Sequence, residues 1–314
     1  MKIALTGATG FAGGPILSEL LMAEHSVSVL VRQPKESQFD AAIKIIKGDL
    51  DDFEALKTLA TGADVVIHVA GAISALNKNG YFKINFAGTQ NVFAAAVAAK
   101  VKRFIFVSSI TARKPELSSY AASKRVAEEF LISQKSKMEI LILRPSAIYG
   151  PGDKATLPLL KVLQNTLAIV PGQRDAKFSL VHVRDFAHVV ASAAIGRQTG
   201  VLEIDDMQGE HSWQELADIN RSMSGKPNRV TYLPRAIVDI AAIASELGSF
   251  FTGRSGMVNR GKVSELYHKD WVAQGAGWPR ENPIGLAEGL AGTVTWYRAN
   301  GWLPPLKQAV RTAQ

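Results

Sequence analysis

The sequence predicts an α/β protein in which a doubly wound parallel sheet is followed by a smaller, mostly helical C-terminal lobe. Short apolar runs of strand length alternate with longer helical patterns through residues 1–200. The strand cores are apolar almost throughout, as in Val-Val-Ile-His-Val at 65–69, which is typical of strands covered by helices on both faces. A glycine-rich segment also follows the first strand and opens the first helix.

The elements of the first half follow in regular alternation. Strands are expected at residues 2–6, 27–31, 43–47, 63–69, 104–108 and 139–144. Helices are expected between them at 13–24, 52–60, 85–100 and 120–135. Beyond Gly150, the pattern predicts a helix at 156–165, a strand at 178–183 and a helix at 185–196 that rejoins the sheet.

The remaining residues predict the lobe. From Asp205 onward the pattern is mostly helical, with breaks at 225–227 and 253–256. We therefore divide the chain into a sheet domain at 1–204 and a substrate-binding lobe at 205–314. No clean linker separates them, and part of 150–177 is expected to contribute to the lobe.

Composition narrows the classes of function. The chain has 314 residues and no cysteine, which excludes disulfides, thiolate metal sites and a cysteine nucleophile. We expect no metal centre, because the sequence has no His-Glu-x-x-His pattern. The apolar stretch at the N-terminus is too short for a signal peptide, and no apolar run is long enough to span a bilayer. A cytoplasmic protein is expected.

The charge is asymmetric. The net charge is +8, and residues 221–314 hold 12 Lys and Arg against 6 Asp and Glu. Such an excess attracts phosphates, nucleic acid or an anionic membrane surface, or it is an ordinary solvated surface. Aromatic residues are not interleaved with the basic ones and no recognised nucleic-acid module is present, so no nucleic-acid partner is expected.

The glycine-rich segment has the composition of a dinucleotide loop. One glycine permits the tight turn, the next admits a pyrophosphate and the third allows close helix–strand packing. The phosphates would lie on the free N–H groups and positive dipole end of the helix. This is the Rossmann-type arrangement, and its expected cofactor-binding residues are Gly7, Thr9, Gly10, Phe11 and Ala12, with Gly13 as the third glycine.

The ends of the next two strands bear on the choice of cofactor. Arg32 ends the second strand, where a carboxylate would bind the ribose 2′-hydroxyl of NAD. An arginine there suits the 2′-phosphate of NADP, so NADP(H) is favoured and NAD(H) stays open; the alternative is a solvated Arg32. Asp49 and Leu50 follow the third strand. Asp49 would accept from the adenine amine, cap the next helix, or do both.

A tyrosine and a lysine four residues apart predict the catalytic pair. Tyr120 and Lys124 share one face of a predicted helix, and a lysine ammonium near a phenol lowers its pKa. The phenol could then exchange a proton with a substrate oxygen. Alone this spacing is common, but Ser108 and Ser109 end the fifth strand at the edge where ligands bind. Ser109 would donate to the same oxygen, with Ser108 as the alternative.

Together these motifs resemble the extended short-chain dehydrogenase/reductase family, also called the epimerase/dehydratase family. The resemblance covers most of residues 1–200, and it also rests on segments 48–50, 69–71, 85–91, 144–152 and 181–185. It implies that Tyr120 is the general acid/base, that Lys124 binds the nicotinamide ribose, and that Ser109 orients the substrate oxygen.

The resemblance also implies roles for residues along the sheet edge. Val69, Ala70 and Gly71 would line the cofactor, and Pro145 and Ser146 would border the nicotinamide. Asn85 would brace the helix and strand near the active site, and Ser108 would lie beside the cofactor. For Asn85 and His182 a purely structural role is the alternative.

The C-terminal third is expected to select the substrate. Residues 235–251 combine a wide apolar face with a narrow polar stripe at helical spacing. Such a helix is buried in the lobe, lies on a membrane beside basic residues such as Arg254, Arg260 and Lys262, or forms a dimer contact. The closing segments resemble the branch of 3β-hydroxysteroid dehydrogenases and dihydroflavonol reductases, a broad grouping that includes bacterial reductases of 3-oxo-ceramide lipids. A hydrophobic small-molecule substrate is therefore expected.

Three functions compete on this basis. The first is an NADP(H)-dependent oxidoreductase that transfers hydride between the nicotinamide and a ketone or secondary alcohol. The second is a nucleotide-sugar epimerase or dehydratase. The third is a non-catalytic cofactor-binding subunit of a membrane complex, against which the intact Tyr120 and Lys124 argue. Because family members often dimerise through two long helices, a homodimer through 85–100 and 120–135 is one expected arrangement.

Overall fold

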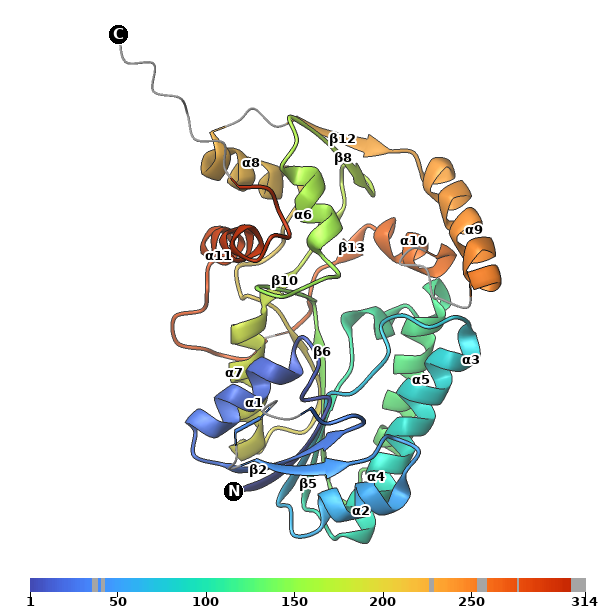
Figure 1. Cartoon of the computed structure of the whole chain (residues 1–314), viewed down its shortest axis with the longest axis vertical. Coiled ribbons are helices and arrows are strands. Elements are labelled where there is room, and N and C mark those ends of the chain that lie inside the picture. Colours follow the sequence, from blue (N-terminus) through green and yellow to red (C-terminus); the bar gives the residue numbers. More distant parts are fainter. Residues whose placement is uncertain (36–38, 41–42, 226–228, 253–258, 276, 306–314) are drawn as a thin grey trace.

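The fold centres on one seven-stranded parallel sheet, seen in the lower half of Figure 1. The computed structural model describes residues 1–35, 39–40, 43–225, 229–252, 259–275 and 277–305. The strand order is β11-β6-β5-β4-β1-β2-β3. The strands are β1 (Lys2–Thr6), β2 (Ser26–Val31), β3 (Lys44–Lys47), β4 (Val65–His68), β5 (Arg103–Val107), β6 (Glu139–Pro145) and β11 (Gly200–Ile204).

The order of the strands places the functional edge. From β1 the chain proceeds outward to β2 and β3, then crosses back so that β4 pairs with the other side of β1. The direction of winding therefore reverses between β1 and β4. Ligands of doubly wound sheets bind beyond the carboxyl ends of the strands at such a reversal.

Helices cover both faces of the sheet. One face packs against α1 (Gly13–Met22) and α7 (Val183–Ile195) through Ile16, Leu20 and Phe186, which are fully buried. The other face packs against α2 (Phe53–Ala60), α4 (Gly88–Ala98) and α5 (Ser119–Ser133). Short elements join these, namely α3 (Lys78–Tyr81), a π-helix at Phe82–Ala87 and 3-10 turns at Ile110–Arg113 and Pro115–Leu117. The predicted doubly wound parallel fold is confirmed.

Two predictions for this half differ from the structure. The seventh strand, β11, was not predicted, because its short run Gly-Val-Leu-Glu-Ile contains a glycine and a glutamate and lacks the continuous apolar core of the other strands. It pairs with β6 along its whole length. The helix predicted at 85–100 is two pieces, since the chain makes a π-helix over Phe82–Ala87 before α4 begins. Asn85 lies in that wider turn, where π geometry often marks a functional position.

The lobe lies above the sheet in Figure 1 and is mostly helical, as expected. Its helices are α6 (Leu157–Leu163), α8 (Trp213–Ser224), α9 (Arg235–Thr252), α10 (Arg260–Leu266) and α11 (Leu286–Ala299). Short parallel strand pairs connect it: β7 (Ala147–Tyr149) with β10 (Leu180–His182), β8 (Leu167–Pro171) with β12 (Arg229–Leu233), and β9 (Lys177–Phe178) with β13 (Asp270–Trp271). The predicted break at 225–227 begins at Gly225, which ends α8 with φ +65°; the rest of it and the predicted break at 253–256 lie outside the described residues.

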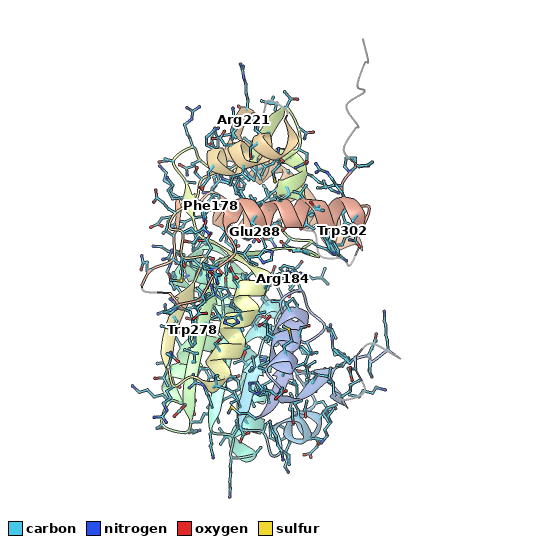
Figure 2. The ribbon with its side chains drawn as sticks, turned by 90° about the vertical axis from the view of Figure 1, so that its left-hand side faces the viewer. Phe178, Arg184, Arg221, Trp278, Glu288 and Trp302 are labelled. Atoms are coloured by element: carbon cyan, nitrogen blue, oxygen red, sulfur yellow. The ribbon has the colours of Figure 1, made fainter. Side chains whose placement is uncertain are left out.

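The lobe has its own core. Tyr297 is fully buried and stacks on Trp302 at 5.3 Å between ring centroids, with Trp296 packed against both. Residues before 180, such as Leu160 and Val170, join the same cluster as α8 and α11. In Figure 2, α11 with Glu288 crosses above Arg184 of α7, while Trp278 lies lower, where it joins the core of the sheet. Trp278 therefore fixes the lobe segment 277–285 against the sheet half.

The described side chains of α9 bear on the alternatives considered for residues 235–251. Its described side chains Val238 and Ala242 are buried against Val263 and Tyr267. On its other face Ile237, Ile240 and Ile243 are 52%, 69% and 45% exposed. Among the described side chains, one face of the helix is therefore buried in the lobe and another apolar face is exposed. No helix among the described residues is long and apolar enough to cross a membrane.

Candidate active site

The glycine-rich loop forms a tight cradle between β1 and α1. Gly7 has φ +82°, and a Cβ there would lie 2.6 Å from the backbone nitrogen of Ala70. A Cβ on Gly13 would lie 1.9 Å from the carbonyl oxygen of Gly7, so both positions require glycine. The N–H of Gly10 donates to the Gly7 carbonyl at 2.9 Å.

The start of α1 is free to bind an anion. Ala12 precedes the helix and provides no side-chain cap, and no acidic residue lies in the first turn. Thr9 and Gly10 are exposed, while Phe11 and Ala12 are partly so. Uncapped N–H groups at a helix N-terminus suit a pyrophosphate, so this cradle fits the dinucleotide that the sequence predicts.

The residues expected near the adenosine part of the cofactor follow strands β2 and β3. Arg32 is exposed directly after β2. The Asp49 carboxylate accepts from the backbone N–H of Asp51 at 2.9 Å, whereas Asp52 caps α2 by accepting from Ala55 at 3.0 Å. Of the two roles considered for Asp49, helix capping therefore falls to Asp52. Leu50 packs on Gly88, where a Cβ would lie 2.7 Å from its Cδ1.

Asn85 braces the segment after β4 against the catalytic helix. Its Oδ1 accepts from the N–H of Ala72 at 2.7 Å. Its Nδ2 donates to the Ala72 carbonyl at 3.0 Å and to Ser123 Oγ at 2.9 Å. Ser123 in turn donates to the Tyr120 carbonyl at 2.7 Å. Both Nδ2 protons of Asn85 are thus used within the protein, and these bonds connect the segment after β4 to the helix that carries Tyr120.

A buried histidine extends this network to the glycine loop. His68, at the end of β4, lies 2.7 Å from Thr6 Oγ1 through Nδ1 and 3.1 Å from Thr89 Oγ1 through Nε2. Thr89 donates to the Asn85 carbonyl at 2.7 Å, and Thr6 accepts from Ala70 at 3.3 Å. Burial, and then the positive charge of Lys124, lower the pKa of His68 to about 3. The ring is therefore neutral at physiological pH.

Tyr120, in the first turn of α5, lies near Ser109, which precedes the 3-10 turn after β5. Ser109 Oγ accepts from the N–H and hydroxyl of Thr111 at 3.2 and 2.9 Å, which leaves its own proton for the Tyr120 oxygen or a ligand. Burial raises the pKa of Tyr120 well above 10, and interaction with the Ser109 side chain opposes this rise. The expectation that Lys124 lowers this pKa is thus not met in the protein alone, because desolvation of the phenol dominates.

Lys124 is buried behind the tyrosine. Its Nζ donates to the Val107 carbonyl at 2.9 Å and lies 4.8 Å from the centroid of the Phe106 ring. Burial lowers the pKa of Lys124 to about 8, although the charge of Glu128 opposes this shift. A Cβ on Gly71 would lie 3.1 Å from both Lys124 Nζ and Asn85 Oδ1. Gly71 therefore keeps an opening beside the ammonium group, which retains donors for a ribose hydroxyl.

Ser108 has a different role from Ser109. Its Oγ donates to Glu128 Oε1 at 2.5 Å, and Arg144 binds the same carboxylate through two nitrogens at 2.9 and 2.6 Å. Arg144 also lies 3.6 Å from Glu203, and Arg113 lies 3.2 Å from it. Because its hydroxyl is committed to this buried ion-pair network, Ser108 does not fit the alternative role of substrate donor.

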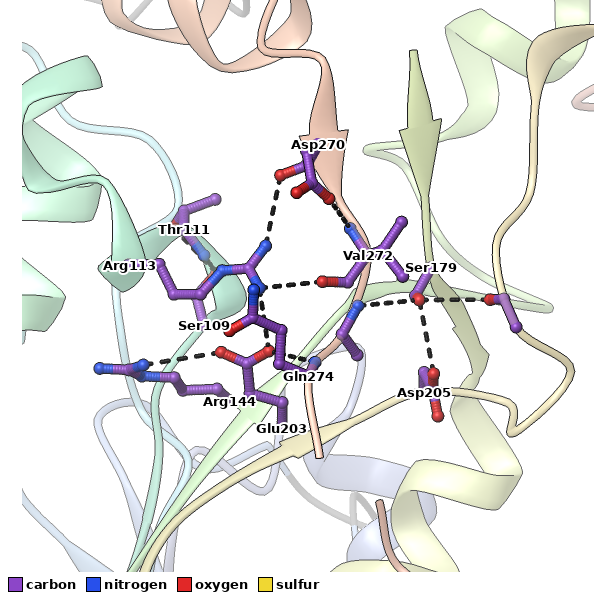
Figure 3. A network of polar contacts seen from close by, with 12 residues as sticks. Ser109, Thr111, Arg113, Arg144, Ser179, Glu203, Asp205, Asp270, Val272 and Gln274 are labelled. Carbon is purple, nitrogen blue, oxygen red and sulfur yellow. Dashed lines mark hydrogen bonds and ion pairs between the residues drawn. The ribbon is translucent and has the colours of Figure 1, made fainter. Parts of the chain in front are cut away.

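The network of Glu203 also ties the lobe to the sheet, as Figure 3 shows. Arg113 donates to the carbonyls of Val272 and Asp270 at 2.9 and 3.3 Å. The N–H of Gln274 donates to Glu203 at 2.7 Å. The end of the strand that follows α10 is therefore held directly over the turn that carries Ser109.

The last expected residues lie after β6. Pro145 ends that strand, and the Ser146 N–H donates to the Ile204 carbonyl at 2.8 Å. The Ser146 hydroxyl is buried and has no partner among the described residues, so it remains available to a ligand. His182 instead caps α7 by accepting from Arg184 at 3.3 Å and packs edge-on against Tyr149 at 5.3 Å. Its structural role agrees with the alternative considered for it.

Several residues that support the site were not predicted from the sequence. These are Thr6, His68, Thr89, Ser123, Glu128 and Glu203. Two of them carried a usable signal: Thr89 lies four residues after Asn85, and Glu128 lies four residues after Lys124. That spacing places each pair on one helix face. Glu203 had no such signal, since it lies in the strand that was not predicted.

Comparison with known proteins identifies the family. The model of the NAD dependent epimerase/dehydratase family matches residues 3–200. This chain belongs to that family. It is thus an NAD(P)-dependent oxidoreductase of the extended short-chain type, as the motifs predicted.

Two relatives with described activities extend the likeness. The chain is 36% identical to the ceramide reductase of Caulobacter vibrioides, across 96% of both chains. It is 27% identical to the 3-beta-hydroxysteroid dehydrogenase of Mycolicibacterium neoaurum, across 62% of this chain and 60% of that one. The first likeness therefore includes the lobe, whereas the second covers a smaller part of the chain.

Solved structures share the fold. The UDP-N-acetylglucosamine 4-epimerase of Methanobrevibacter ruminantium superposes with a TM-score of 0.73 at 18% identity, over 95% of this chain and 98% of that one. MoeE5, solved with UDP-glucose and NAD, gives a TM-score of 0.68 at 20% identity, over 96% of this chain and 99% of that one. At such identities the likeness extends to the fold alone.

Proposed function

We propose that this protein is an NADP(H)-dependent reductase of a ketone group on a hydrophobic, lipid-like substrate, and that the 3-oxo group of a ceramide is that ketone. One observation carries the proposal: the 36% identity to a ceramide reductase extends over 96% of both chains, including the lobe. A substrate lobe shared along its whole length supports a shared class of substrate, while the sheet half supports the reaction class.

The site supports reduction by proton donation from Tyr120. A bound reduced nicotinamide would supply the hydride to the carbonyl carbon. Since burial raises its pKa, Tyr120 holds its proton at neutral pH and can give it to the substrate oxygen. Ser109 would orient that oxygen, and Lys124 would hold the ribose hydroxyls beside the opening at Gly71. In this account Asn85 and Ser123 hold the first turn of α5 in place.

The preference for NADP rests on Arg32. Its exposed guanidinium lies at the end of β2, beside the position of an adenosine ribose in this fold, and suits a 2′-phosphate. We expect Arg32→Ala to raise the KM for NADPH roughly tenfold, the loss of a charge-assisted contact of about 1.4 kcal/mol, and to leave the KM for NADH nearly unchanged. An equal change for both cofactors would contradict the assignment.

The test of the proposed function is turnover by the purified protein. We expect NADPH to be consumed in proportion to the reduction of a detergent-solubilised 3-oxo-ceramide, with a product two mass units heavier. Conversion of a UDP-hexose to its epimer, with no net consumption of cofactor, would instead establish the nucleotide-sugar alternative. No turnover of any ketone, together with stable incorporation into a membrane complex, would support the non-catalytic alternative.

A further inference from the structure

Helix α9 carries an exposed apolar surface that its packing in the lobe does not require. We define the isoleucine ridge as Ile237, Ile240 and Ile243, which are 52%, 69% and 45% exposed and lie three residues apart. The opposite side of the helix is already packed, because Val238 and Ala242 are buried against α10. A helix that buries one apolar face and exposes another has a second partner to cover.

We propose that the isoleucine ridge docks on the surface of an anionic lipid bilayer. This inference deepens the proposed function, on which it rests, because a ceramide-type substrate resides in such a bilayer. Interfacial helices insert branched apolar side chains at the boundary of headgroups and acyl chains and place basic residues beside them. No spanning segment is needed for such contact.

The lobe carries an excess of positive charge that suits an anionic surface, since residues 221–314 hold 12 Lys and Arg against 6 Asp and Glu. In α9 and α10 the paired basic side chains are the more exposed: Arg235 is 54% exposed against 36% for Asp239, and Lys262 is 53% exposed against 5% for Glu265. The chain as a whole carries a net charge of +8. Anionic headgroups attract exposed basic residues near the surface by about 1 kcal/mol each.

A second copy of the chain fits the ridge less well. Three isoleucines on one helix are few compared with the roughly 20–30 residues a side that a stable protein interface uses. A bilayer accepts a narrow ridge, because acyl chains adapt to its shape and need no complementary surface. The observations therefore favour a lipid surface as the occupant.

The position of α9 connects the proposed bilayer contact to the catalytic helix α5. Its partner α10 lies on the cap of the catalytic helix, since a Cβ on Gly261 would lie 2.8 Å from Ser118 Cβ. Ser118 donates to Glu265 of α10 and accepts from Ala121 of α5 at 2.9 Å. Tyr120 follows two residues later. A bilayer at the ridge would thus be linked to the helix that carries Tyr120 through α9, α10 and the contacts of Ser118.

Vesicle co-sedimentation of the full-length protein tests the proposal without requiring turnover. We expect binding to vesicles rich in phosphatidylglycerol and weaker binding to phosphatidylcholine alone. The triple variant Ile237→Gln, Ile240→Gln, Ile243→Gln should bind the phosphatidylglycerol vesicles at least roughly tenfold more weakly than the wild type, because the apolar contact of each isoleucine is lost. Ile195→Gln is the matched control: Ile195 is 65% exposed but ends α7, far from α9 and near the amino edge of the sheet, and should bind like the wild type.

The outcomes separate this proposal from the proposed function. Reduction of a short-chain soluble ketone should be unchanged in the triple variant, and its thermal midpoint should match the control. Wild-type protein that binds neither vesicle, or a triple variant that binds as well as the wild type, would overturn the docking surface while leaving the ketone reductase intact. A wild-type dimer that the triple variant converts to monomer, without vesicle binding, would assign the ridge to a second copy.

Discussion

The sheet half and the lobe differ in what their buried polar groups do. In the sheet half, buried hydroxyl, amide and imidazole groups form one connected network that runs from the glycine loop to the catalytic helix, through Thr6, His68, Thr89, Asn85 and Ser123. In the lobe, aromatic and aliphatic packing around Tyr297 dominates, and the polar contacts, such as those of Gln164 with Asn220 and Arg298, join lobe elements to one another.

This difference assigns the two halves different tasks. A connected polar network fixes the atoms of the sheet half closely, which suits proton transfer. An apolar core with an exposed isoleucine ridge constrains shape and surface instead, which suits selection of an apolar substrate. The ion pairs of Glu203 join the two halves where Ser109 lies.

The largest effect is expected at Tyr120. Tyr120→Phe removes the proton donor and leaves the ring in place, so kcat should fall about 10²–10⁴-fold. Cofactor affinity, measured by fluorescence titration with NADPH, should remain within about twofold, since the glycine loop is untouched. A variant that keeps full activity would show that the sheet half does not perform the chemistry as described.

The two adjacent serines should separate catalysis from stability. Ser109→Ala should lower kcat about 10²-fold with little change in stability, because the substrate oxygen loses a donor. Ser108→Ala should lower the free energy of unfolding by about 1–3 kcal/mol with little change in kcat, because the buried Glu128 loses a donor. Chemical denaturation and steady-state kinetics of both variants measure this, and exchanged outcomes would reverse the two assignments.

Two histidines should give the two halves opposite responses to acid. Because the pKa of His68 is lowered to about 3, its contribution to stability is present above pH 6.5 and is lost as pH falls toward 3. Hydrogen bonds and charge from Asp206 and Glu215 raise the pKa of His211 despite its burial. The stability from His211 is therefore fully present below pH 6.5 and is lost as pH rises through its folded-state pKa.

Variants of these histidines test the contrast by urea unfolding at several pH values. Between pH 7 and pH 5, His68→Gln should lose about 2 kcal/mol less stability than the wild type, since about 1.5 pH units lie below the unfolded pKa. His211→Gln should lose more than the wild type over the same interval. If both variants responded alike, the assignment of opposite pKa shifts would be wrong.

The sequence was informative where local patterns decide structure. The continuous apolar runs predicted six of the seven strands of the main sheet, and the glycine spacing predicted the cradle at Gly7 and Gly13. Both features depend on residues that are neighbours in the sequence. The strand Gly200–Ile204 was missed, because it gains its structure from pairing with β6 across the sheet. Asp52 rather than Asp49 caps α2, and only the path of the loop decides between them.

The hydrogen bonds of the supporting network and the packing of the lobe could not be predicted from the sequence either, because they join residues far apart in the chain. Nothing near His68 in sequence indicates that Thr6 and Thr89 will bind its two nitrogens. The apolar pattern of 235–251 left open whether the helix is buried, and only the packing of Val238 and Ala242 shows which face the lobe covers. The pKa of Tyr120 depends on its burial, which its four-residue spacing from Lys124 does not reveal.

Isotope transfer tests the central claim most directly. NADPH carrying deuterium at C4 on the transferred side is incubated with the wild-type protein and a 3-oxo-ceramide, and the product is analysed by mass spectrometry. We expect one deuterium on the carbinol carbon for each cofactor oxidised, and almost none with Tyr120→Phe over the same time. A product without deuterium, or label retained in the cofactor while a UDP-hexose is epimerised, would contradict net ketone reduction at this site.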